Sequence, residues 1–308
     1  MSQRSKIKKQ EIVTAYFLLT PALTLFLVVG LFSIVFSIGL SFFRLSSGSL
    51  LSSAIFAGID NFRDFLFGRD QLLTRNFWRA LGHNIWISGS MICFVIPLSL
   101  SLAMLLQRIG RGVAIFRTVF LIPMVTASVS IYYVWTGIYN ARGSLNQFLA
   151  NIPFLDNLIQ ANGWLGELNT ALPSMIVMII WSAIPGTLIL YFAGLQTIDK
   201  NLYEAADIDG GSDFQKLLHI TWPMLTPITV IAVVINLNAA LQIFEQIWVM
   251  TKGGPAGSTM VLNVLIYQEA FVTGAGLGRA NAMGWSVFLL TFIMSLISMR
   301  LLRDPADR

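Results

Sequence analysis

The sequence predicts an all-α integral membrane protein with six transmembrane helices, and three observations carry that prediction. Hydrophobic residues make up 56% of the 308 residues and charged residues only 11%, whereas soluble domains carry about 25% charged residues. The mean hydropathy is +0.72. Apolar runs long enough to cross a bilayer recur along the chain, and six spans of about 20 residues each suit its length. This composition argues against a soluble enzyme.

We expect one membrane domain between two short polar tails. Residues 1–11 form a basic N-terminal tail, residues 12–302 the transmembrane domain, and residues 303–308 a charged tail. The expected spans lie at about 12–43, 84–106, 113–139, 173–195, 224–250 and 280–302. The first apolar run is too long for the core of a signal peptide and lacks a small-residue cleavage site, so we expect it to be retained as a span.

The positions of Lys and Arg set the expected orientation, because short cytoplasmic loops are enriched in these residues. With the N-terminus inside, the inner segments hold twelve of the 20 Lys and Arg residues, and the outer segments hold eight. This distribution predicts cytoplasmic N- and C-termini and places the polar segment 198–223 in the cytoplasm. It also accounts for the modest positive charge of the chain, so we expect no nucleic-acid partner.

The segment 198–223 interrupts the apolar runs, and its pattern predicts two short helices with a glycine corner. It holds two capping-box patterns: Asn201 with Glu204, and Ser212 with Gln215. Gly210-Gly211 can supply the positive φ that ends the first helix. The first helix would present carboxylates beside small side chains, namely Glu204, Asp207 and Asp209 with Ala205 and Ala206.

Six positions of this segment stand at characteristic spacings: Glu204, Ala205, Ala206, Gly210, Ile220 and Pro223. They resemble the cytoplasmic EAA loop of permease subunits of ABC-type importers. One departure is Trp222, where the family usually has Leu. Further patches fit the family in order, around Phe56–Phe62, Arg117–Asn146 and Thr251–Pro255, and resemble its carbohydrate-importer branch, the MalF-like or UgpA-like permeases. The alternative interpretation of the segment is an ordinary amphipathic loop between two membrane helices.

The resemblance implies a MetI-like permease fold in a bacterial or archaeal cell (inner) membrane. The chain would form half of the translocation pathway for a sugar or sugar-like solute. The segment 198–223 would contain a coupling helix that docks into an ATP-binding cassette subunit, and Glu204 would pair with a basic residue of that subunit. The coupling residues expected on this basis are Glu204, Ala205, Ala206, Asp209, Gly210, Ile220 and Pro223.

The resemblance also implies the partners and the absence of a cofactor on this chain. The partners are an ATP-binding cassette subunit, a second homologous permease that we expect to be a different chain, an extracytoplasmic solute-binding protein, and membrane lipid. ATP and Mg would belong to the partner ATPase, so we expect this chain to be no enzyme. The sequence has no Gly-x-x-x-x-Gly-Lys-Ser/Thr loop. Its two histidines, His83 and His219, form no metal-binding pattern.

The fifth expected span, 224–250, carries polar residues that point to a functional surface. Asn238, Gln242 and Glu245 stand at i, i+4 and i+7 and would share one face of a continuous helix. Polar groups within a span favour a partner subunit or a water-filled path over lipid. One hypothesis is that this face lines the path of a polyol, whose hydroxyls bind amides and carboxylates. The alternative is hydrogen bonding between helices of neighbouring subunits.

The sequence also has to be compared with two other functions of membrane proteins. A stand-alone ion-coupled secondary transporter or channel often shows an internal repeat and paired charges within its spans. The sequence has no duplicated half and one acidic candidate within a span, Glu245. A membrane-embedded enzyme would need a cluster of nucleophile, base and metal ligands, and no such cluster is recognisable. The permease interpretation is therefore favoured.

Overall fold

The computed structural model describes residues 3–45, 53–108, 113–274 and 276–301. Nearly all of the described elements are helices, as the composition predicts. The two short strands β1 (Phe43–Arg44) and β2 (Ile55–Phe56) pair antiparallel. The chain divides into two compact units. Unit 1 comprises residues 1–69 and 266–285, and unit 2 comprises residues 70–265 and 286–308.

Unit 1 contains the N-terminal apolar helix and the polar segment after it. Its elements are α1 (Gln3–Leu25), η1 (Phe26–Leu31), α2 (Phe32–Leu40), β1, β2 and α3 (Asp60–Leu66), with the end of α15 (Leu262–Phe271) and the start of α16 (Leu277–Leu301). The buried amide of Asn61 donates to the carbonyls of Ser41 and Phe43, at 2.8 and 2.9 Å. A helix leaves its last carbonyls without backbone partners, so Asn61 closes the end of α2.

Ion pairs fix α3 within unit 1. The buried carboxylate of Asp64 lies 3.3 Å from the guanidinium of Arg44 and 3.2 Å from that of Arg279. Arg69 contacts the neighbouring Asp60 at 2.6 Å. A buried carboxylate needs such partners because its desolvation is otherwise costly. Asp64 therefore joins α3 to β1 and to the first turn of α16.

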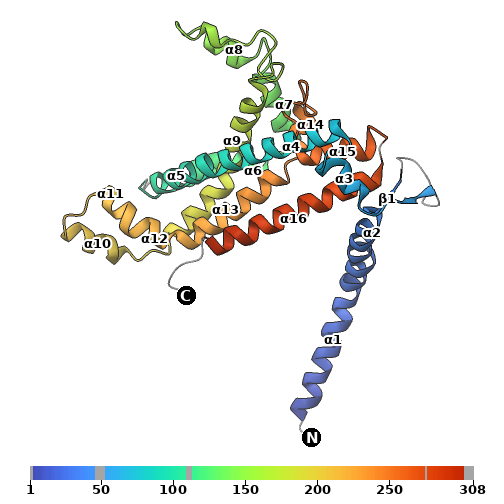
Figure 1. Ribbon diagram of the computed structural model, residues 1–308. Coiled ribbons are helices and arrows are strands. Elements are labelled where there is room, and N and C mark those ends of the chain that lie inside the picture. The colour runs from blue at the N-terminus through green and yellow to red at the C-terminus, as the bar shows by residue number, and fades with distance from the viewer. Residues whose placement is uncertain (1–2, 46–52, 109–112, 275, 302–308) are drawn as a thin grey trace. The chain divides into compact units, whose positions relative to one another are not determined.

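Unit 2 is a helical assembly around α9 (Ala171–Leu195), which is contacted by α4, η3, α5, α6 and α13 (Figure 1). The elements before α9 are α4 (Gln71–Ser90), η3 (Met91–Val95), α5 (Ile96–Arg108), α6 (Val113–Val125), α7 (Ser128–Ile138), α8 (Ser144–Ala150) and η4 (Asp156–Leu158). Those after it are α10 (Lys200–Ile208), α11 (Asp213–Lys216), η5 (Leu217–Thr221), α12 (Trp222–Met224), α13 (Thr226–Leu241) and α14 (Glu245–Met250). The 25 residues of α9 span about 37 Å, so the loops before and after α9 lie at opposite ends of this helix.

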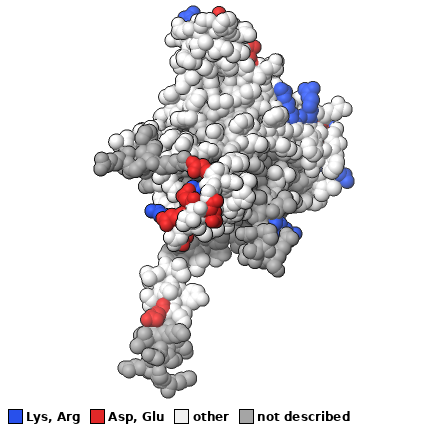
Figure 2. Space-filling view, turned by 90° about the vertical axis from the view of Figure 1, so that its left-hand side faces the viewer, with Lys and Arg blue, Asp and Glu red and all other residues white. Residues whose placement is uncertain are grey.

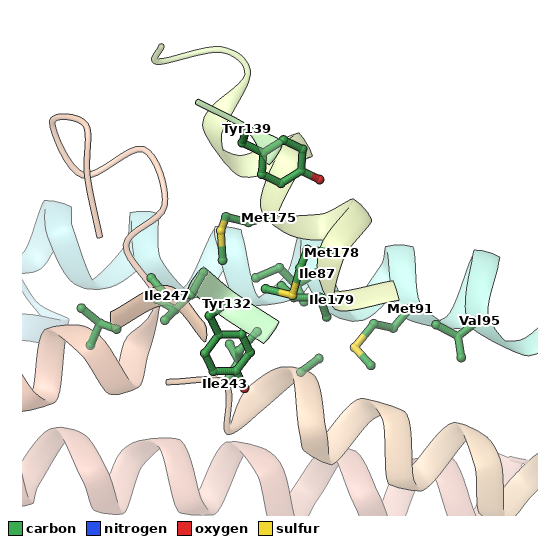
Figure 3. Packing of buried hydrophobic residues seen from close by; sticks show 13 residues of the cluster. Ile87, Met91, Val95, Tyr132, Tyr139, Met175, Met178, Ile179, Ile243 and Ile247 are labelled. Atoms are coloured by element: carbon green, nitrogen blue, oxygen red, sulfur yellow. The ribbon is translucent and has the colours of Figure 1, made fainter. Parts of the chain in front are cut away.

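Two apolar clusters hold unit 2 together. The first, drawn in Figure 3, consists of Ile87, Met91, Val95, Tyr132, Tyr139, Met175, Met178, Ile179, Ala240, Ile243, Ile247, Val261 and Val264. The second lies toward the other end of α9 and consists of Ile96, Leu100, Ala103, Tyr191, Leu195, Ile198, Leu225 and Ala232. Helix α9 contributes residues to both clusters and therefore links the two ends of unit 2.

Among the described residues, five helices are long and apolar enough to cross a membrane: Thr14–Leu40, Gln71–Gln107, Ala171–Leu195, Thr226–Met250 and Leu277–Ser298. Each overlaps one of the spans expected from the sequence. The second of these helices begins at Gln71, earlier than the expected 84, and α1 already includes most of the expected tail 1–11. Residues 1–2, residue 302 and the expected tail 303–308 lie outside the described residues.

The expected span 113–139 is divided between two helices, α6 and α7. Thr118–Val125 and Ser128–Ile138 form a bent pair at 103°, which counts as a sixth span if the pair crosses the membrane together. Pro123 lies in the last turn of α6 and cannot donate a backbone hydrogen bond. The Thr126 hydroxyl then binds the carbonyl of Ile122 at 2.8 Å, and Ala127 adopts an extended ψ of 123°. The chain therefore turns between α6 and α7.

The expectation that Asn238, Gln242 and Glu245 lie on one face of a continuous helix is wrong, because α13 ends at Leu241 and α14 begins at Glu245. The break frees backbone groups that a continuous helix would satisfy. The buried side chain of Asn84 in α4 donates to the carbonyl of Ala240 at 2.8 Å and accepts from the amide of Leu262 at 3.0 Å. Breaks within membrane helices persist where neighbouring groups satisfy the freed backbone in this way.

Candidate functional site

The segment 198–223 folds into short helices, and its corners have identifiable causes. Helix α10 begins at Lys200, because the Asp199 carboxylate accepts the amide of Asn201 at 2.9 Å. The predicted capping box of Asn201 and Glu204 is therefore wrong: Asp199 caps the helix two residues earlier. Gly210 has a φ of +73° and ends α10 as expected. Such a φ is strained for residues with a Cβ.

The second predicted capping box is confirmed. The Ser212 hydroxyl accepts the amide of Gln215 at 3.3 Å, and the Gln215 side chain accepts the amide of Ser212 at 2.8 Å. These two bonds satisfy donors that the first turn of a helix otherwise leaves unpaired. Helix α11 thus begins directly after the glycine corner.

Contacts tie one side of α10 to the rest of the loop. Lys216 of α11 forms an ion pair with Asp207 of α10. The Tyr203 hydroxyl bonds the buried hydroxyl of Thr221 at 2.9 Å. A cavity of about 260 Å³ adjoins these contacts and is lined by Met104, Gln107, Leu195, Tyr203, Asp213, Lys216, Leu217 and Thr221. Tyr203 also packs against the second apolar cluster, so this side of α10 contacts residues of α5, α9 and η5.

The opposite side of α10 is exposed. Glu204, Ala205, Asp209 and Gly210 are exposed, and Ala206 is half-buried. Within the part of the chain that the structure describes, the Glu204 carboxylate has no hydrogen-bond or ion-pair partner. Ile208, at the end of α10, is 88% exposed. Figure 2 views unit 2 from the side of α10 and α11 and shows carboxylates gathered there. The structure therefore presents an acidic surface with exposed apolar and small side chains.

The two remaining residues of the predicted coupling set lie below this surface. Ile220, in η5, packs against the second apolar cluster. Pro223 lies within the short helix α12, where its fixed φ suits a first turn. Ile220 therefore links the loop to the core of unit 2, while the role of both residues in coupling stays a prediction.

The three polar residues of the fifth span do not share one helix face, because the break at 242–244 separates them. Asn238 donates to the carbonyl of Val234 at 2.9 Å and to the Ser295 hydroxyl at 3.2 Å. Gln242 is exposed at the end of α13. The exposed Glu245 carboxylate accepts from the hydroxyls of Ser128 and Tyr132, at 3.1 and 3.4 Å. Asn238 thus contacts another helix, whereas Gln242 and Glu245 lie at the break.

Comparison with known proteins decides the family. The model of the family described as binding-protein-dependent transport system inner membrane component matches residues 95–303, more than half of the chain. The chain belongs to this family. It is a permease component of a binding-protein-dependent ABC transport system and lies in a membrane. This result confirms the resemblance seen in the EAA-like pattern and replaces the rival interpretations of a stand-alone secondary transporter and of a membrane enzyme.

Relatives of this permease cover nearly its whole length. A probable ABC transporter permease protein, YurN of Bacillus subtilis (strain 168), is 33% identical over 303 residues, covering 97% of this chain and 99% of the relative. The trehalose/maltose transport system permease protein MalF of Thermococcus litoralis is 28% identical over 292 residues, 95% of this chain and 93% of the relative. The lactose transport system permease protein LacF of Rhizobium radiobacter is 28% identical over 306 residues, 98% of each chain.

The fold of the permease matches a solved importer. A chain in the crystal structure of a bacterial ABC transporter involved in the import of the acidic polysaccharide alginate superposes with a TM-score of 0.78. The two chains are 23% identical, and the match covers 98% of this chain and 99% of that one. The MetI-like permease fold is confirmed at this level.

Some residues of the candidate site escaped sequence reasoning. Ser128 and Tyr132 bond Glu245 but lie more than a hundred positions earlier in the chain. Lys216 is one of the inner positive charges, and the sequence does not predict its ion pair with Asp207. One local signal of the bend was available: Pro123 and Thr126 precede Ser128, and a proline within an apolar run favours a helix break. Nothing in the sequence indicates that this break contacts Glu245.

Proposed function

We propose that this permease forms half of the translocation pathway of an ATP-driven importer for a sugar or sugar-like solute. Two relatives are named for sugar transport, one for trehalose and maltose and one for lactose, and their names support the sugar class. A second homologous permease, as a different chain, supplies the other half of the pathway. An extracytoplasmic binding protein delivers the solute. Both termini and the segment 198–223 lie in the cytoplasm, in agreement with the distribution of Lys and Arg.

The observation that carries the proposal is the exposed face of α10. Glu204 is exposed there without a partner among the described residues, beside the small side chains of Ala205 and Ala206. The segment 198–223 carries five carboxylates against two lysines. An ATP-binding subunit with a basic residue in its docking cleft would pair with Glu204, and the small neighbours allow its backbone to approach closely. ATP and Mg are bound and ATP is hydrolysed on that subunit.

The contacts of α10 supply a mechanical route into the membrane helices. Tyr203 bonds Thr221, and Ile220 packs against the second apolar cluster, which includes residues of α5, α9 and α13. Closure of the ATPase dimer moves α10, and these contacts pass the movement to α9 and α13. Alternating access follows from the resulting displacement of the helices that line the pathway.

The solute pathway includes the break between α13 and α14. Exposure of Gln242 and Glu245 at this break supports a position beside the solute, where an amide and a carboxylate bind hydroxyls. Asn238 is bonded to Ser295 and to the carbonyl of Val234. This pairing favours a role for Asn238 in joining helices over direct contact with solute.

Affinity purification in mild detergent tests the proposal. The tagged permease is co-expressed with the genes next to its own, and the ATP-binding subunit and second permease that accompany it are measured by mass spectrometry. Glu204→Ala is expected to reduce recovery of the ATPase while recovery of the second permease is unchanged. Asp156→Ala is the matched control, because Asp156 is an exposed carboxylate at the opposite end of α9.

Two results would overturn the proposal. One is purification of the permease without any ATP-binding subunit. The other is equal recovery of the ATPase with the wild type, Glu204→Ala and Asp156→Ala, which would place the docking surface elsewhere.

A further inference from the structure

Two breaks in the membrane helices of unit 2 meet at one carboxylate. The bend between α6 and α7 ends at Ser128, and the break between α13 and α14 ends at Glu245. The Ser128 hydroxyl donates to Glu245 Oε2 at 3.1 Å, and the Tyr132 hydroxyl lies 3.4 Å from the same oxygen. Helices α7 and α14 pack against each other. The two breaks are therefore one structural feature.

The surroundings of Glu245 indicate whether its carboxylate contacts lipid or water. Non-helical backbone within a membrane is tolerated where it is buried in protein or lines a water-filled cavity. The Glu245 side chain is exposed, and a charged group in lipid is costly. Its carboxylate is therefore expected to meet water, and the two breaks next to it are the type of backbone found along transport pathways.

The charge of Glu245 is left uncompensated by its neighbours. Both of its hydrogen-bond donors are neutral hydroxyls, which hold the carboxylate in place without cancelling its charge. Among the described residues, no Lys, Arg or His forms an ion pair with Glu245. Oε1 has no bonded partner in this part of the chain and is free to accept a hydroxyl. A fixed negative charge repels anions strongly where the surrounding medium is less polar than bulk water.

We infer that Glu245 is a selectivity residue of the solute pathway, which disfavours anionic solutes and accepts hydroxyls of neutral or positively charged sugars. The inference rests on the proposed function, because it places Glu245 in the pathway of an importer. It narrows the solute class: sugars that carry carboxylates, such as uronates, are disfavoured, and uncharged or amino sugars are admitted. Ser128 and Tyr132 are positioning residues that aim the carboxylate.

The test measures the potential at the break with charged thiol reagents, so it needs no knowledge of the natural solute. Gln242→Cys is introduced in a Cys93→Ser background, in the assembled transporter in proteoliposomes. Residues 242 and 245 are three positions apart, at most about 11 Å along the chain. Modification rates are compared for a cationic and an anionic methanethiosulfonate of similar size. We expect the cationic reagent to react about ten-fold faster, relative to their rates with a free thiol.

Variants at position 245 separate charge from structure. Glu245→Gln keeps an acceptor for Ser128 and Tyr132 and is expected to bring the rate ratio close to that for a free thiol. Glu245→Asp keeps the charge and is expected to retain most of the preference. A cysteine at 242 that neither reagent modifies, or a ratio unchanged by Glu245→Gln, would overturn the inference, because the break would then be covered by protein or lipid or the charge would be screened.

The same preparation separates this inference from the proposed function. The ATP-binding subunit is quantified in each sample. If the ATPase is present and the rate ratio shows no cationic preference, the selectivity role of Glu245 is wrong and the importer assignment stands. If the preference is present and no ATPase accompanies the permease, the proposed coupling fails and Glu245 still lines an aqueous path.

Discussion

Single buried amide side chains bind backbone groups at points where helices are interrupted. Asn84 satisfies the carbonyl of Ala240 and the amide of Leu262, two backbone groups that the break between α13 and α14 and the start of α15 leave without helical partners. Asn61 does the same for the end of α2. In each case one buried amide makes two hydrogen bonds to backbone groups.

The first prediction concerns Asn84. Asn84→Leu removes both bonds and leaves the Ala240 carbonyl and the Leu262 amide buried and unpaired, which is expected to destabilise the protein by about 1–3 kcal/mol. The apparent melting temperature of the purified permease in detergent measures this loss. Asn76→Leu, in the same helix and without a hydrogen-bonded side chain among the described residues, is the control and is expected to change it little. An equal effect of the two substitutions would contradict the role of Asn84.

The second prediction concerns the corner after α10. At Gly210 a Cβ would meet no atom within 4 Å, but φ is +73°, so a substitution is limited by backbone strain and not by crowding. Gly210→Val is expected to cost about 1–2 kcal/mol locally and to reduce recovery of the ATPase by displacing α10. Gly210→Asn is the matched control, since Asn tolerates this conformation. Equal ATPase recovery with Val and Asn would refute the requirement for this corner.

At the scale of elements, the ion pairs of α3 make its stability depend on pH. The hydrogen bond from Arg69 lowers the pKa of Asp60 below its usual value. A lowered pKa in the folded state means that the pair stabilises α3 at neutral pH, above the ordinary carboxyl pKa of about 4. This stabilisation is lost as the pH falls through the lowered pKa of Asp60.

The substitution Arg69→Gln tests this pH dependence. At pH 7, Arg69→Gln is expected to speed amide hydrogen exchange in α3, after correction for intrinsic rates, and near pH 3 the difference from wild type is expected to shrink. Arg63→Gln is the control: Arg63 contacts Asp60 at 3.9 Å, against 2.6 Å for Arg69, so its effect should be smaller. A difference that stays constant between the two pH values would show that the pair does not stabilise α3.

The sequence predicts where apolar helices lie but not where they are interrupted. Hydropathy and length located segments that overlap every long apolar helix, because each reads the composition of a contiguous window. The bend after Pro123 has a local signal, but the break at 242–244 depends on groups far away in the chain, such as Asn84, which bonds Ala240. A short window of sequence does not include both partners of such a contact, so it cannot predict the break. The prediction that Asn238, Gln242 and Glu245 share one helix face was wrong for the same reason.

The helices of segment 198–223 were predicted more fully because their signals are local. Ser212 and Gln215 are three residues apart, and Gly210 marks its own corner, so the pattern and the structure agree there. Two residues of this segment could cap α10, and the sequence prediction chose the wrong one: Asp199, and not Asn201, caps the helix. The exposed face of Glu204 also follows from its position in the motif, whereas the tie between Lys216 and Asp207 needed the fold.

The orientation of the whole protein in the membrane is a prediction that two highly exposed residues can test. Phe154 in the loop before α9 is 94% exposed, and Ile208 at the end of α10 is 88% exposed. Because α9 separates these loops, they are expected on opposite sides of the membrane.

The fourth prediction uses these two residues. In a Cys93→Ser background, Phe154→Cys is expected to react with a membrane-impermeant maleimide added to intact cells, whereas Ile208→Cys is expected to react only after permeabilisation. Each variant serves as the control for the other. The reverse pattern would place the segment 198–223 outside the cell and contradict the positive-inside argument.

We propose that Glu204 on α10 couples this permease to an ATP-binding subunit. The most direct measurement is ATP hydrolysis by the assembled transporter in proteoliposomes, stimulated by its solute-loaded binding protein. Glu204→Gln removes the charge and keeps the shape, and loss of a charge-assisted hydrogen bond of about 1.5–3 kcal/mol predicts a fall in stimulated activity of about ten-fold or more. Asp156→Asn is expected to leave it unchanged. Full stimulation with Glu204→Gln would contradict this coupling role of Glu204.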